Sequence, residues 1–247
     1  MTTFRYAPEL IARYPTVVGG VILASGLTNG PTPDELRRAF AAEQQTALAR
    51  IGETPLSQIS ALAAWRSAFR EFGVDPTQYR CAAEALLRRL TKKGEIPSVN
   101  TLVDTGNLVS IRYALPVALF DTRAIAGALT VRFADGTERY TTLGDGEIEH
   151  PVPGEVIFAD GSAQVHARRW CFRQSEQSAV RADTTEVLVT VEAHHAQGRT
   201  DVLAAVADLQ GLLQTYAGSG GSAEVLDASH AETTGAVLSS AEAERGR

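Results

Sequence analysis

The chain has 247 residues, 44% of them hydrophobic and 21% charged, and its formal net charge is -6. These values are typical of a globular protein that is stabilised by a buried core and needs no disulfide bonds or structural metal ions. The acidic net charge argues against a protein that coats DNA or RNA by bulk charge. Cys81 and Cys171 form no disulfide framework and no zinc spacing, so we expect reduced thiols, no metal and no cofactor. The sequence has no signal peptide and no apolar run of about 20 residues, which predicts a cytoplasmic protein without membrane contact.

Helical patterns dominate the first third of the chain. A short strand leads into a helix that begins near Pro8, and the next strand contains Gly19 and Gly20, which indicate close approach by neighbouring backbone. The predicted segments are the strand-helix unit 4–14, the strand 16–27 and helices at 34–50, 57–72 and 81–93. The last of these helices ends in four cations, which we interpret as a solvated helix end that suits the helix dipole: Arg88, Arg89, Lys92 and Lys93.

Strand patterns dominate the second half. Strands are predicted at 128–133, 138–143, 155–159, 163–171 and 185–193. Asp135-Gly136 and Asp160-Gly161 are typical of hairpin turns between them. Helices first and hairpins afterwards favour an α+β fold, in which the helices of the N-terminal third pack on a mixed, largely antiparallel sheet.

The C-terminal region changes in composition. An amphipathic helix is predicted at 199–216, and we expect one domain over residues 1–217. Residues 218–247 are rich in Gly, Ser, Ala and Glu, which predicts a flexible linker and a largely disordered tail. Within this tail, Val225–Leu226 has the composition of a short docking strand.

Polar residues interrupt the apolar stretch Ile96–Asp121 at helical spacing. Asn100, Asp104 and Asn107 lie three or four residues apart, on one face of a helix that is otherwise apolar enough to be buried. Buried polar groups need partners, because an unmade hydrogen bond costs roughly 1–3 kcal/mol. These side chains therefore either hold backbone groups within the core or line a pocket.

The second notable stretch runs over residues 168–176, where three arginines surround an aromatic pair. Such a cluster could bind a phosphate or a carboxylate, and it could equally be a strand with exposed arginines paired to the acidic surface. Cys171 as a nucleophile would need an electropositive setting and a nearby base, and the sequence indicates only the first. His194 and His195 lack a third spaced metal ligand.

Residues 79–193 carry several motifs of one family. They are YRCAAEALLRRL, IPSVNTLVDTGNLVSIRYALPVALFD, LTVRFADGTERYTTLG, GEVIFADG, RRWCFRQSEQSAV and a strand ending in VEA. In order and spacing this region resembles the editing module of the phenylalanyl-tRNA synthetase beta subunit, named after its third and fourth domains. Trp65, Arg66 and Phe69 extend the resemblance to the free-standing proteins of this B-three/B-four domain family.

The resemblance implies site residues position by position. The family's Asn falls on Asn107 and its Glu on Glu176, both of which are kept and would be catalytic. Its Thr falls on Gly106 and its His on Ala118, and both are departures that change the substrate pocket. Where the synthetase module has glycine-rich backbone, this chain has Trp170, Phe172 and Arg173. The residues expected to contact the acceptor end or line the pocket are Arg168, Arg169, Trp170 and Arg173.

By resemblance, we expect a free-standing aminoacyl-tRNA editing hydrolase that cleaves the ester of mischarged tRNA, with the tRNA acceptor end and its amino acid as partners. We do not expect a complete phenylalanine-tRNA ligase, because the class-defining ATP-binding motifs and an anticodon module are absent and 247 residues leave little room for them. The alternative is a non-catalytic module that binds an amino acid or small metabolite and has lost the editing His. A third alternative is a different enzyme that uses Cys171.

Overall fold

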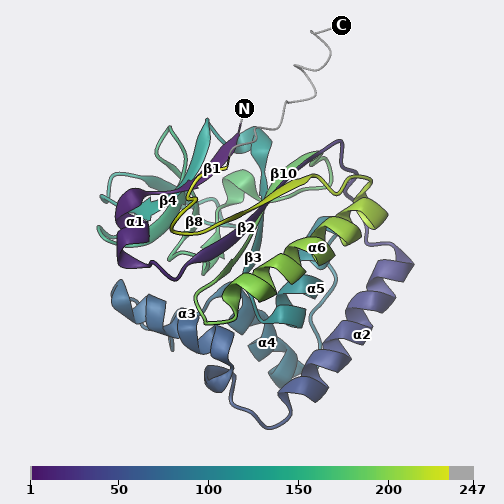
Figure 1. The fold of residues 1–247 in the computed structure, drawn as a ribbon. Coiled ribbons are helices and arrows are strands. Elements are labelled where there is room, and N and C mark those ends of the chain that lie inside the picture. Colours follow the sequence, from purple (N-terminus) through teal and green to yellow (C-terminus); the bar gives the residue numbers. More distant parts are fainter. Residues whose placement is uncertain (1, 234–247) are drawn as a thin grey trace, which may run out of the picture.

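A four-stranded antiparallel sheet forms the middle layer of the computed structural model, which describes residues 2–233 (Figure 1). Its strands, in spatial order, are β11 (Ser222–Leu226), β2 (Val18–Ser25), β10 (Glu186–Ala193) and β3 (Val117–Asp121). All three pairings are antiparallel. The high content of β-branched residues in β2 and β10 explains why these two long strands form the centre of the sheet.

Helices cover one face of this sheet. α5 (Thr101–Tyr113) packs on β3, and α6 (Gly198–Ala217) packs on β2 and β10 (Figure 1). α2 (Asp34–Ile51) and α4 (Ala82–Lys93) pack against α5, while α3 (Ser60–Glu71) contacts the end of β10. Within residues 2–233, none of the helices combines the length and apolar character needed to cross a bilayer.

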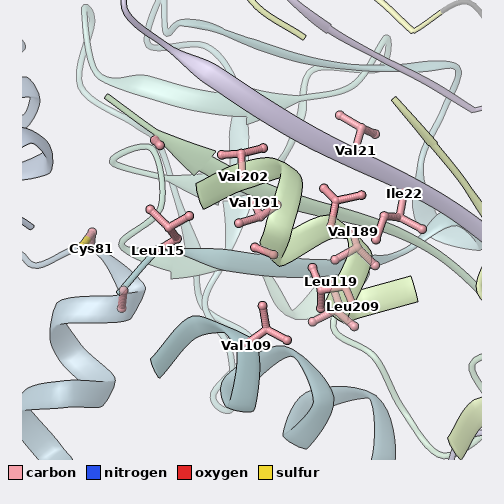
Figure 2. Close-up of a cluster of buried hydrophobic side chains, with 14 of the residues drawn as sticks. Val21, Ile22, Cys81, Val109, Leu115, Leu119, Val189, Val191, Val202 and Leu209 are labelled. Carbon is pink, nitrogen blue, oxygen red and sulfur yellow. The ribbon is translucent and has the colours of Figure 1, made fainter. Parts of the chain in front are cut away.

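The interface between sheet and helices is a close-packed apolar core. Figure 2 shows Ile22, Val189 and Leu119 of the sheet near Val109 of α5 and Leu209 of α6. All five side chains are buried. Close packing extends to the backbone, because a Cβ atom at Gly20 would lie only 2.3 Å from a methyl group of Val206 on α6.

A second, seven-stranded sheet packs on the other face. Its order is β1 (Thr3–Tyr6), β4 (Ala128–Phe133), β7 (Val156–Ala159), β8 (Gln164–Arg168), β5 (Arg139–Thr141) and β6 (Ile148–Glu149), with β9 (Arg173–Gln174) also paired to β8. β1 pairs with β4, and β5 with β8, in parallel, and the other pairings are antiparallel. The remaining short elements are α1 (Pro8–Arg13), η1 (Leu56–Gln58), η2 (Thr122–Ala124) and η3 (Glu176–Ser178).

The α+β fold with mixed, largely antiparallel strands is confirmed, but the strands form two sheets and not one. The predicted hairpin at Asp135-Gly136 is wrong, because β1 and β7 occupy both edges of β4 and leave none for β5. The turn is held instead by the buried carboxylate of Glu138. It accepts hydrogen bonds from the backbone N–H groups of Asp135 at 3.1 Å and Gly136 at 3.0 Å, and from the guanidinium of Arg132.

The segment after α6 differs from the flexible linker predicted for it. Residues 222–226 pair with β2 as the edge strand β11, and the strand that we expected at Val225–Leu226 lies within it. Further along, Thr233 exchanges hydrogen bonds with the backbone of Phe4, which ties this segment to β1. The rest of the predicted tail, residues 234–247, lies outside the described residues.

The start of α5 shows that two of the three polar residues in this stretch have a structural role. Asn100 caps the helix, since its Oδ1 accepts the N–H of Val103 at 2.9 Å. Asp104 is fully buried and accepts hydrogen bonds from Thr32 Oγ1 at 2.6 Å, the N–H of Val99 at 2.9 Å and the hydroxyl of Ser98. Together these two side chains hold the preceding loop against the helix.

Candidate functional site

Strand alternation gives the face of β3 and β10 opposite the helices a different character. Ala118 is paired with Thr190 in the register of these strands, and Glu192 lies two residues further along β10. Because successive strand residues point to opposite faces, these three side chains point away from α5 and α6 and towards the seven-stranded sheet.

A cavity of about 90 Å³ opens on this face, between the start of α4, strands β3, β8 and β10 and the turn from β8 to β9. Its apolar lining includes Ala82, Ala118, Phe158, Ala167 and Trp170. Its polar lining consists of Cys171, Arg173, Gln174, Thr190 and Glu192. The cavity therefore combines an apolar floor with a few polar groups, which is the usual character of a small-molecule site.

Glu192 is the buried acidic group of this cavity. Its Oε1 accepts a hydrogen bond from the hydroxyl of Tyr6 at 2.8 Å and another from Nε1 of Trp170 at 3.0 Å. Within residues 2–233, no hydrogen bond is made to its Oε2. Burial raises the pKa of Glu192 to about 7, against the opposing effect of the two donors. This carboxyl group therefore titrates near neutral pH.

Gly19 makes the contact between Tyr6 and Glu192 possible. It is the β2 partner of Glu192, and a Cβ atom at this position would lie 2.0 Å from the hydroxyl oxygen of Tyr6. The sequence predicted close approach by neighbouring backbone at Gly19 and Gly20, whereas the structure shows close approach by side chains, Tyr6 on one face of β2 and Val206 on the other.

A tight turn places the side chain of Trp170 in the cavity wall. Both Arg169 and Trp170 have positive φ angles, 46° and 59°, a conformation that costs non-glycine residues of order 1–3 kcal/mol. The turn is held by a backbone hydrogen bond from the N–H of Trp170 to the carbonyl of Val156 at 2.6 Å and by one from the N–H of Arg169 to Glu155 at 2.9 Å. The indole is fully buried.

Arg168 has a structural position beside this turn. Its guanidinium is buried and donates to both carboxyl oxygens of Glu155 at 3.0 Å, and it also pairs with Glu149. These carboxylates outweigh the effect of burial and raise the pKa of Arg168. Arg168 does not line the cavity. Its Nε, Nη1 and Nη2 atoms are all paired with carboxylates, so they are not available for a phosphate.

Arg169 and Arg173 lie at the outer side of the turn. Arg173 lines the cavity and is exposed, with its guanidinium carbon 5.6 Å from the ring centre of Phe172. Arg169 is half-buried and lies over the ring of Tyr79, at 4.0 Å from the ring centre. Both cations are thus placed by aromatic rings at or near the cavity mouth.

Cys171 lines the cavity, but its thiol is poorly suited to be a nucleophile. Burial and the neighbouring thiol of Cys81 raise the pKa of Cys171 well above its ordinary value. The prediction that the arginines supply an electropositive setting for a thiolate is therefore not supported by the pKa of this group.

The two adjacent histidines have other surroundings. The ring of His194 packs edge-on against Trp65 and Trp170, and His195 contacts Asp201 at 2.8 Å. Among residues 2–233, no three His, Cys, Asp or Glu side chains gather as metal ligands.

The three other positions taken from the resemblance lie outside the cavity. Gly106 is buried against β3, where a Cβ atom would lie 2.5 Å from Leu119 Cδ1. Asn107 follows it on α5 and is half-buried. Glu176 lies in η3, where it accepts the N–H of Gly144 at 3.1 Å and lies 3.8 Å from Arg181.

The structure thus brings together three of the predicted site residues, Ala118, Trp170 and Arg173, and adds Glu192, which residue-by-residue reasoning missed. A signal for Glu192 was present in the sequence. It is a carboxylate near the end of a strand of Val, Leu and Thr residues, and a buried charge in such a run needs a reason.

Comparison with known proteins places these observations in a family. The phenylalanine-tRNA ligase beta subunit of Geobacter metallireducens is 33% identical over 105 residues, which are 42% of this chain and 13% of that protein. The chain therefore matches only a small part of this relative's length. The chain is also similar to a solved structure, an N-terminal fragment of the phenylalanyl-tRNA synthetase beta subunit from Pyrococcus horikoshii. The matched region covers 91% of this chain and 50% of the solved chain, at 12% identity and a TM-score of 0.45.

The family model of the B3/4 domain matches residues 64–204, which is more than half of the chain and includes every residue lining the cavity. The chain belongs to the B3/4 domain family.

Proposed function

We propose that the chain is an aminoacyl-tRNA editing hydrolase that acts in trans on mischarged tRNA, and that the cavity receives the aminoacyl group. The observation that carries this proposal is the meeting of Ala118, Trp170 and Arg173 around one cavity that also contains the carboxyl group of Glu192. Membership of the B3/4 domain family supports an RNA-linked ester as the substrate, since the relatives matched are subunits of a tRNA ligase.

Hydrolysis of an aminoacyl ester requires a water molecule to be deprotonated as it attacks the carbonyl carbon. Glu192 suits the role of general base, because its pKa of about 7 lets it be ionised and still basic near neutral pH. Water bound at Oε2 would lose a proton to the carboxylate, the ester C–O bond would break, and the ribose oxygen would leave with a proton. The products are a free amino acid and an uncharged tRNA.

Arg173 is the group placed to meet negative charge. Its exposed guanidinium lies at the cavity, where it would stabilise the developing oxyanion or hold the phosphate of the terminal nucleotide. The apolar part of the lining, formed by Ala118, Phe158 and Ala167, would hold the amino-acid side chain. A cavity of about 90 Å³ favours a small side chain over an aromatic one.

A panel of mischarged tRNAs incubated with the protein tests the proposal. We expect at least one to be deacylated well above buffer, and Glu192→Gln to lower the rate by about 10²- to 10⁴-fold, because a general base contributes about this much. Glu176→Gln is the matched control and should keep the wild-type rate. No turnover of any member of the panel would refute the proposal. If Glu176→Gln or Asn107→Ala lowered the deacylation rate and Glu192→Gln did not, the catalytic residues would be those that the resemblance implies.

A second function is favoured by a specific observation. The position of the family's His is occupied by Ala118, and Asn107 and Glu176 do not line the cavity. These departures fit a module that binds a free amino acid or small metabolite without catalysis. A thermal-shift screen with amino acids separates the two functions, because tight binding of a free amino acid without deacylation supports only the second.

A further inference from the structure

We propose that a basic groove along α4 binds the backbone phosphates of a single-stranded RNA segment whose 3′ end enters the cavity. The groove is defined by four cationic side chains, Arg66, Arg80, Arg88 and Lys92. The inference rests on the proposed function, because it assigns the path of the RNA that this function requires. It also identifies a binding surface separate from the cavity.

The groove has the composition of an anion site. Its volume is about 460 Å³, and its walls come from α3, α4, the loop between them, and the end of α2 with the residues up to 57 that follow it. The four cations face one carboxylate, that of Glu84, although the chain as a whole has a net charge of -6. Hydroxyl groups complete the lining: Thr54, Ser57, Thr77 and Thr91. Cations and hydroxyls are the groups that most often contact phosphate oxygens.

The inner pair of cations is held in place. Glu84 is buried and accepts from Arg66 Nη1 at 2.7 Å, and its Oε1 lies 3.7 Å from Nε of Arg80. That Arg80 Nε is buried and makes no hydrogen bond among residues 2–233. The carboxylate of Glu84, whose Oε2 is also buried without a hydrogen bond in this part of the chain, faces this nitrogen as an ion pair, so the inner cations are held by the protein itself.

The outer pair of cations is free to bind. Arg88 and Lys92 are four residues apart on α4, so they lie on one face of the helix and point into the groove. Both are exposed, and neither forms an ion pair within the described part of the chain. The sequence-based interpretation of these residues as a solvated helix end therefore accounts for their exposure but not for their place in a groove.

An aromatic and basic path joins the cavity to the groove. Arg173 lines the cavity and contacts Phe172, Arg169 contacts both Phe172 and Tyr79, and Arg80 of the groove follows Tyr79 in the chain. Alternating cations and aromatic rings are how proteins bind single strands, with phosphates on the cations and bases on the rings. From Glu84 to Lys92 the groove follows α4 for about 12 Å, at 1.5 Å per residue. This arrangement favours an RNA strand over a small phosphate compound.

The test measures RNA binding without any amino acid attached. A fluorescein-labelled single-stranded RNA of 12 nucleotides, ending in CCA, is titrated with the full chain at several salt concentrations, and binding is followed by anisotropy. The double variant Arg88→Gln with Lys92→Gln removes two groove cations, whereas Arg89→Gln with Lys93→Gln removes two exposed cations that do not line the groove. Both variants change the net charge equally, and thermal melting confirms that both are folded.

We expect the groove variant to weaken binding about tenfold or more at 50 mM salt and to lower the slope of log K against log salt by about 1.4, because each phosphate contact on a single strand contributes about 0.7. The control variant should leave the slope unchanged. Equal losses in both variants, no binding of the RNA by the wild type, or full competition by millimolar inorganic phosphate would each overturn the inference. Failure here leaves deacylation in the tRNA panel intact, whereas failure of deacylation alone leaves RNA binding measurable, so the two proposals are separable.

Discussion

The two faces of the four-stranded sheet use the same strands for opposite purposes. On the helix side, Leu119, Val189 and Val191 are buried against α5 and α6. One residue away on the same strands, Ala118 and Glu192 line a cavity. The difference teaches that strand alternation separates packing from binding over most of these strands, with Val117 at the start of β3 as the exception, since it lines the cavity and also lies near Gly106.

The two faces of the sheet also explain which of the residues implied by the resemblance line the cavity. Ala118 lies on the cavity face of β3, whereas Gly106 contacts the opposite face of the same strand. Substitutions on the helix face should therefore change the free energy of unfolding, and those on the cavity face should change pH dependence or activity. Four predictions test this separation.

Leu209→Ala on α6 should have the largest effect. Leu209 is fully buried on the helix face, and its truncation leaves a cavity between α6 and the sheet (Figure 2). We expect a loss of about 2–5 kcal/mol in the free energy of unfolding, measured by urea denaturation. Leu203→Ala on the same helix is the control, since Leu203 is 49% exposed and should cost less than about 0.5 kcal/mol. Equal losses would mean that the helix face is not the close-packed one.

Glu192 should give the cavity face a distinct pH dependence of stability. Burial raises its pKa from an ordinary value of 4.5 to about 7, so the folded chain holds this proton more tightly than the unfolded chain does. The contribution of Glu192 to stability should therefore fall by roughly 3 kcal/mol as the pH rises from about 4.5 to about 7, and should not change further above that range. Glu192→Gln keeps an acceptor for Trp170 and Tyr6 and should remove this fall.

Urea denaturation of both proteins between pH 4.5 and pH 8 measures the difference. His194, whose pKa burial lowers to about 3, contributes an opposite slope below its ordinary pKa in both proteins, so the difference between them isolates Glu192. Parallel curves for wild type and Glu192→Gln would show that this carboxyl group titrates normally.

Much of the fold could be predicted from local patterns. The α5 helix begins at Thr101 after an Asn cap, and strand β4 occupies the predicted residues 128–133, because both depend on periodicity and on neighbours in sequence. Strand β3 was missed within an apolar stretch in which strand and helix patterns are hard to separate. The pairing of β1 with β4 joins residues about 125 positions apart, and no local pattern encodes it.

The site could be predicted only in part, for a related reason. Trp170 and Arg173 were found because aromatic and cationic residues in one short stretch are visible in sequence. Glu192 was missed because its importance depends on Tyr6 and Trp170, which reach it from distant strands and turns. For Asn107, spacing gives its position along a helix but not whether that face meets a pocket or a neighbouring strand.

Gly106→Thr should destabilise the chain through the helix face. It introduces the residue that the resemblance implies at this position, but the new Cβ atom would lie 2.5 Å from Leu119 Cδ1. We expect a loss of about 1–3 kcal/mol, because overpacking forces neighbouring side chains and backbone to shift. Adding Leu119→Ala makes room, so the double variant should lose less than the sum of the single variants. Strict additivity would place the clash elsewhere.

Ala118→His is the matching change on the cavity face, and its effect on stability should be the smallest, below about 1 kcal/mol. The imidazole can occupy the cavity of about 90 Å³ instead of displacing packed side chains. For the same reason it should compete with the ligand and lower kcat/KM for deacylation by at least about tenfold, since even one methylene group in an apolar pocket changes kcat/KM by about 10- to 200-fold. Gly106→Thr and Ala118→His both introduce residues that the resemblance implies, so a stability loss in the first and an activity loss in the second would show that the two faces are separate. If Ala118→His instead lost several kcal/mol, β3 would be packed on both faces, and the cavity would have to lie elsewhere.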